Sequence, residues 1–100
     1  YKITATARPE QIIDLINTAL SGNFMAARKH LDELLLDQGL SGEDVVGQIY
    51  RAMFNLSIPQ EKMVELIDVI GEVDFRIAEG ANERIQLEAL IAHFTLRGRN

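Results

Sequence analysis

The sequence predicts an all-α protein, a compact bundle of five helices in one domain. The chain has 100 residues, which is room for one hydrophobic core. Apolar residues recur every three or four positions over five successive stretches, the spacing of one face of an α-helix. Glycine, proline or polar capping residues separate these stretches, and apart from a weak alternation in residues 1–7 no strand pattern is present.

Composition narrows the class of protein further. Apolar residues make up 47% of the chain and charged residues 25%, as in a soluble globular domain, and no apolar run approaches the length of a membrane span. The absence of cysteine excludes disulfide scaffolds and thiolate metal sites and fits an intracellular, cytoplasmic protein. The formal net charge of -5 argues against binding nucleic acid through the general field of this domain.

The first two helices are predicted to form an antiparallel pair. The first begins at Pro9, because proline suits the first helical position, and ends before Gly22. The second follows at once, with Asn23 as its cap, and stops at Gly39. The connection is short, so the two helices must turn back on each other. Residues 1–8 are expected to be an extended linker that leads into the bundle.

The next two helices follow the same logic. Ser41 caps the third helix, and two acids in its first turn suit the helix dipole. Its apolar face is wide and takes in Tyr50 and Phe54. The fourth helix opens near Pro59 and runs to about Ala78.

The fourth helix carries an acid on its apolar side and an aromatic ring on the other. Asp74 falls among the isoleucines of the stripe and is predicted to point inward, where it needs a cation or hydrogen-bond donors. Arg84, Arg28 or the backbone at the start of the fifth helix could supply them. We favour an internal tie between the fourth and fifth helices, with an inter-subunit contact as the alternative. Phe75 falls off the apolar stripe, beside Val64, and is predicted to point outward. We expect these two residues to form a separate apolar contact, either inside the domain or across an interface.

The fifth helix, from about Asn82 to Leu96, is apolar on two opposite faces, which predicts burial on both. Either it is the central helix of the bundle, or its second face meets another subunit. One face holds Leu87, Leu90, Ile91 and Phe94, and the opposite face holds Ile85, Ala89, Ala92 and Leu96.

Motifs for catalysis are missing from the sequence. Residues 39–42 are rich in glycine but lack the lysine–serine pair of a phosphate-binding loop. His30 and His93 fall on different helices, neither with a second histidine at metal-ligand spacing, and both are best explained as surface or edge histidines. We therefore expect no enzyme active site, no metal and no cofactor in this segment.

Four stretches of the chain resemble a known family. They are Gly22-Asn23-Phe24 with Ala27, Arg28 and Leu31; residues 39–44; residues 56–59; and residues 70–76 continuing through 79–90. In these stretches the sequence is similar to the C-terminal domain of the replication factor C small subunit, most of all its archaeal form. The resemblance covers nearly the whole chain.

The resemblance implies a function in DNA replication. The parent subunit would be an AAA+ ATPase that binds ATP and magnesium in upstream domains, joined to this piece by residues 1–8. Residues 9–97 would be its collar domain, with residues 98–100 as a tail. Collar domains hold the subunits of the clamp loader in a ring that loads the sliding clamp onto primed DNA. The implied partners are other small subunits, in a homo-oligomer or a hetero-oligomeric ring, the large subunit, and the clamp and DNA through the other domains.

Residues at the junction of the fourth and fifth helices are the candidates for subunit contacts. Two other classes stay open: a helical adaptor for a partner helix, and a helix-turn-helix DNA-binding domain. The latter has only Arg51 as a basic residue on its would-be recognition helix. The candidates for subunit or junction contacts are Asp74, Phe75, Arg76, Asn82, Arg84, Ile85, Gln86 and Ala89.

Overall fold

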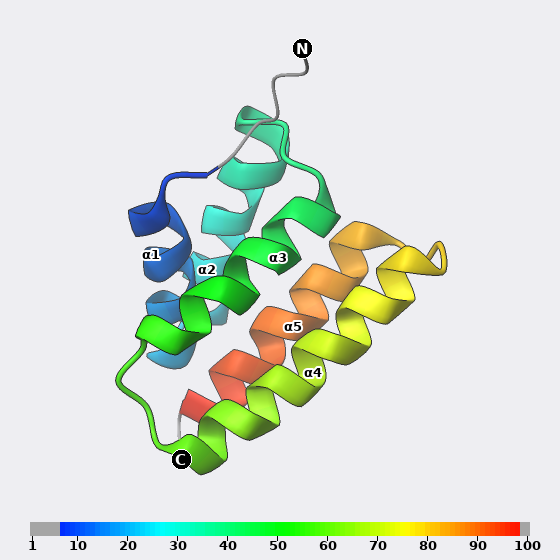
Figure 1. The fold of residues 1–100 in the computed structure, drawn as a ribbon. Coiled ribbons are helices and arrows are strands. Elements are labelled where there is room, and N and C mark those ends of the chain that lie inside the picture. Colours follow the sequence, from blue (N-terminus) through cyan, green and yellow to red (C-terminus); the bar gives the residue numbers. More distant parts are fainter. Residues whose placement is uncertain (1–6, 99–100) are drawn as a thin grey trace.

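The computed structural model describes residues 7–98, which form five α-helices and no strand (Figure 1). The predicted all-α bundle of five helices is therefore confirmed. Predictions for residues 1–6 and 99–100 lie outside the described residues. The helices are α1 (Pro9–Leu20), α2 (Phe24–Asp32), α3 (Gly42–Ala52), α4 (Gln60–Ala78) and α5 (Glu83–Gly98). A π-helical turn, Glu33–Asp37, extends α2, and a 3-10 turn, Met53–Asn55, extends α3.

The starts of three helices follow from local chemistry, and the caps predicted at Asn23 and Ser41 are confirmed, whereas the cap at Asn82 was not predicted. Asn23, Ser41 and Asn82 each accept a hydrogen bond from the backbone amide three residues later, at 3.1, 3.0 and 2.9 Å respectively. These bonds satisfy amides that have no partner within the helix. Gly22, after α1, has φ +95°, and Gly39, before α3, has φ +69°. Both lie in the left-handed region, which glycine adopts without steric cost.

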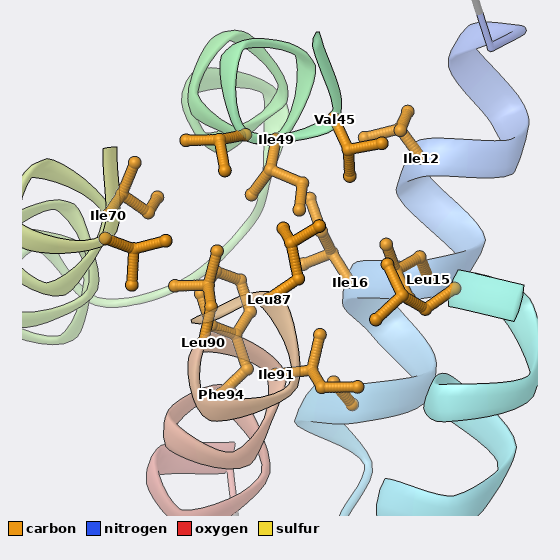
Figure 2. Packing of buried hydrophobic residues seen from close by; sticks show 14 of the residues in the cluster. Ile12, Leu15, Ile16, Val45, Ile49, Ile70, Leu87, Leu90, Ile91 and Phe94 are labelled. Carbon is orange, nitrogen blue, oxygen red and sulfur yellow. The ribbon is translucent and has the colours of Figure 1, made fainter. Parts of the chain in front are cut away.

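Helix α5 is the centre of the core. Figure 1 shows α4 and α5 as a long antiparallel pair, with α1, α2 and α3 packed beside it, and α5 contacts all four other helices. In Figure 2 its leucines meet isoleucines from α1, α3 and α4. Leu87, Leu90, Ile91 and Phe94 are at most 2% exposed, which confirms the predicted inner face of α5. Within residues 7–98, no helix is both long and apolar enough to cross a membrane.

The inward orientation predicted for Asp74 is wrong, because this residue is exposed. The buried line of α4 is narrower than the sequence pattern and runs through every third or fourth residue. Asp74 follows Val73 directly and is therefore rotated by about 100° from it around the helix axis. The buried residues of this line are Leu66, Ile70, Val73 and Ile77.

The apolar face predicted for α3 is also too wide. Tyr50 and Phe54 are 44% and 57% exposed, whereas Val45, Val46, Ile49 and Met53 are buried. The two rings meet edge to face, with centroids 5.3 Å apart and an interplanar angle of 87°. This geometry is favourable for aromatic pairs, so the rings cover part of each other at the surface.

Candidate interaction surface

The second apolar face of α5 lies at the surface. Ile85 is 64% exposed and Leu96 is 62% exposed. Two alanines lie between these residues on α5: Ala89 is exposed and Ala92 is half-buried. We call these four residues the α5 outer stripe. Their spacing of four, three and four places them on one line about 16 Å long, opposite the buried leucines. In the isolated domain, therefore, α5 is buried on one face only.

Helix α4 exposes two further apolar side chains, Phe75 (63%) and Val64 (59%). The outward orientation of Phe75 is thus as predicted. The two residues are eleven positions apart in one continuous helix, which separates them by about 16 Å along its axis. The predicted contact between Phe75 and Val64 inside the domain is therefore wrong, and both side chains are available to a neighbour.

A network of ion pairs joins α2 to α5. Arg84 donates from Nε to Oε2 of Glu88 at 2.6 Å and from Nη2 to Asp32. Arg28 pairs with the same oxygen of Glu88 at 3.1 Å. The hydrogen bond between Arg84 and Glu88 lowers the pKa of Glu88 below its ordinary value and raises the pKa of Arg84 above its ordinary value. The internal tie that the sequence suggested for Asp74 thus exists elsewhere: Arg84 and Arg28 fix α5 to α2, not to α4.

The other predicted contact residues fall into two groups. Asn82 caps α5, and the side chain of Gln86 is half-buried with its Oε1 atom buried and without a hydrogen-bond partner among the described residues. Together with Arg84, these residues act inside the domain. Arg76 pairs with Glu72 one turn earlier on the exposed side of α4. The outward group is therefore Asp74, Phe75, Arg76, Ile85 and Ala89.

A shallow depression between α3 and α4 was not predicted. Its volume is about 280 Å³, and we call it the α3–α4 hollow. Two glycines, Gly47 on α3 and Gly71 on α4, interrupt otherwise apolar patterns and leave this space. That pair of glycines is the signal from which the sequence could have indicated it. The lining residues are Val46, Gly47, Tyr50, Ile67, Ile70, Gly71 and Asp74.

Residues 7–98 hold no group of three or more histidine and acidic side chains placed to bind a metal ion. His30 lies on α2 and His93 on α5. The distinctive features of this domain are instead at its surface: an apolar stripe, an aromatic pair and a hollow. They define a helical domain that is built around one central helix and leaves apolar side chains at its surface.

Comparison with known proteins identifies the family. The model of the replication factor C C-terminal domain matches residues 7–93. The replication factor C small subunit of Methanosarcina barkeri is 58% identical over 96% of this chain, and that of Archaeoglobus fulgidus is 56% identical over 95%. The chain belongs to the family of replication factor C C-terminal domains, which confirms the resemblance drawn from the sequence. It spans 31% and 30% of the length of these two relatives.

Proposed function

We propose that this chain is the collar domain of a replication factor C small subunit and that it holds the subunits of a clamp loader in a ring. Family membership and the names of the relatives support this function. The observation that carries it is the α5 outer stripe, because a central helix that exposes Ile85 and Leu96 opposite its buried face has apolar surface for a neighbour.

Burial of this stripe is enough to contribute to association. Full burial of an isoleucine or leucine side chain contributes about 1.5–3 kcal/mol. Ile85 and Leu96 each keep nearly two thirds of their surface exposed, so covering the remainder contributes about 1–2 kcal/mol per residue. The cost of ordering two partners reduces this gain, so the remaining contact area must supply the rest.

A ring of like domains sets the geometry of the contact. Each copy has a neighbour on two sides, so one face of a copy meets a different face of the next, and the ring closes only when the rotation per copy permits. Other small subunits and the large subunit are the neighbours in this proposal. The clamp, primed DNA, ATP and magnesium are assigned to the parts of the subunit beyond residues 9–97, which leaves this domain a mechanical task.

The test is size-exclusion chromatography with light scattering on the chain and on two variants. Ile85→Glu places a charge in the stripe and is expected to reduce the apparent mass at high concentration. Leu36→Glu is the matched control, since Leu36 is 73% exposed and lies in the π-helical turn that follows α2, outside α5. Association that is equally strong in Ile85→Glu contradicts the proposed role of the stripe. A chain that stays monomeric but captures a foreign helix favours the adaptor alternative.

A further inference from the structure

The α3–α4 hollow combines an apolar floor with a charged rim. Its floor is made by Ile67, Ile70 and Val46. A β-carbon added at Gly71 would meet nothing within 4 Å, so this part of the depression is open space. Its rim is formed by the exposed residues Tyr50 and Asp74. The hollow can therefore receive an apolar group and a positive charge together.

Asp74 is the specific element of this rim. Within residues 7–98 its carboxylate makes no ion pair and no hydrogen bond, although six ion pairs are formed elsewhere. It lies one helical turn after Ile70, which places the β-carbons of these two residues about 5–6 Å apart on one face of α4. A fitting occupant carries an apolar side chain and a cation at the same separation. The exposed ring of Tyr50 also attracts a cation.

The chain itself presents such a pair on α2. Met25 is 65% exposed, and Lys29, also exposed, follows it by one helical turn. Among the lysines and arginines in the described part of the chain, only Lys29 and Arg51 have no bonded or ion-pair partner. Arg51 extends back along α3, with its guanidinium 3.5 Å from the position of a β-carbon at Gly47, and lines a separate depression between α1 and α3. Lys29 is the remaining cation.

The helix that carries the pair lies apart from the two helices that line the hollow, because α2 packs mainly against α1 and α5. In Figure 2, α3 and α4 occupy the upper left and α2 the lower right, with α5 and α1 between them. Figure 1 agrees, because α2 lies behind α3 when the molecule is viewed from the side of α3 and α4. Complementary surfaces on helices that are separated in this way cannot meet within one copy. They can meet between successive copies in a head-to-tail arrangement, and each copy keeps one surface free for the next.

We propose that Met25 and Lys29 of one copy dock into the α3–α4 hollow of the next, with Lys29 paired to Asp74. This inference rests on the proposed ring. In such a ring one face of a copy meets a different face of the next, and the α3–α4 hollow is assigned to that different face. The α2–α5 ion pairs hold α2 beside the helix that bears the outer stripe, so the docking pair and the stripe lie on adjacent helices of the same domain. Met25 fills the apolar floor and Lys29 supplies the charge that Asp74 lacks.

A charge exchange tests this contact directly. Self-association of the whole chain is measured by sedimentation equilibrium for the wild type, Lys29→Asp, Asp74→Lys and the double variant that carries both changes. Each single reversal places like charges together and is expected to weaken association about tenfold or more. The double variant restores the pair with opposite polarity and is expected to recover to within a few-fold of the wild type. Circular dichroism checks that each variant is folded.

Matched reversals at other sites serve as controls. Asp68→Lys changes an exposed acid of α4 that does not line the hollow, and Arg8→Asp changes an exposed cation before α1. When Asp68→Lys is combined with Lys29→Asp, or Arg8→Asp with Asp74→Lys, no recovery of association is expected. If the wild type associates but the exchange gives no recovery, or the single reversals have no effect, the docking inference is wrong and the ring proposal stands. If the wild type does not associate, the proposed self-assembly fails and the docking inference fails with it.

Discussion

Removing the charge of Glu88 should loosen the attachment of α5 to α2. Its carboxylate accepts from Arg84 at 2.6 Å and faces Arg28 at 3.1 Å, and its side chain is 26% exposed. An exposed ion pair contributes about 0.2–1 kcal/mol, and a shielded hydrogen bond to a charged group about 1.5–3 kcal/mol. The site lies between these cases, so we expect Glu88→Gln to lower the free energy of unfolding by about 1–2 kcal/mol.

The assay is urea and thermal unfolding followed by circular dichroism. For a domain of this size each kcal/mol corresponds to a fall of about 4–8 °C in Tm. Glu72→Gln is the control, because Glu72 forms an exposed pair with Arg76 one turn away and should cost a few tenths of a kcal/mol (~0.3). If the free energy of unfolding falls no more in Glu88→Gln than in Glu72→Gln, the ion pairs of Glu88 do not stabilise the attachment of α5 to α2.

The same network predicts a dependence on pH. The pKa of Glu88 is lowered in the folded state because Arg84 hydrogen-bonds to its carboxylate. A lowered folded pKa contributes stability above the unfolded value, and this contribution is lost as the pH falls through the folded value. The difference between wild type and Glu88→Gln should therefore be full at neutral pH and shrink as the pH falls below the ordinary pKa of a glutamate carboxyl. A difference that is constant from neutral to acid pH contradicts this assignment.

Two further substitutions separate the inner and outer roles at the α4–α5 junction. Asn82→Ala removes the cap of α5, whose side chain accepts from the Ile85 amide at 2.9 Å, and should destabilise the domain by about 1 kcal/mol in urea unfolding, with no loss if the bond is unimportant. Phe75→Glu changes a side chain that is 63% exposed, so the monomer should keep its helical signal while sedimentation shows weaker association. Loss of helical signal in Phe75→Glu would instead place this ring in the core.

The sequence was most informative where structure is local. Helix starts at Asn23 and Ser41 depend on contacts three residues away, and a capping residue is visible in the sequence itself. The two faces of α5 could be predicted for a similar reason, because the helical period alone assigns Ile85 and Leu96 to the side opposite Leu87 and Leu90.

Exposure at the edge of a stripe could not be predicted in the same way. The period gives the angle of Asp74 or Tyr50 around its helix, but only the packing of neighbouring helices decides how wide the covered face is. The ion pairs between α2 and α5 could not be predicted either, because Asp32 and Arg84 are 52 residues apart and no local pattern connects them. Arg84 could be named as a partner for a buried acid, but the acid it contacts depends on the tertiary fold.

The proposed function requires that this domain associates with itself through apolar surfaces that its own core does not cover. Sedimentation velocity on the chain, from micromolar to millimolar concentration, tests it most directly. We expect a shift with concentration from the monomer to a defined larger species, with the shift diminished in Ile85→Glu and retained in Leu36→Glu. A monomer that persists across the whole range would contradict the claim that this domain by itself holds subunits together.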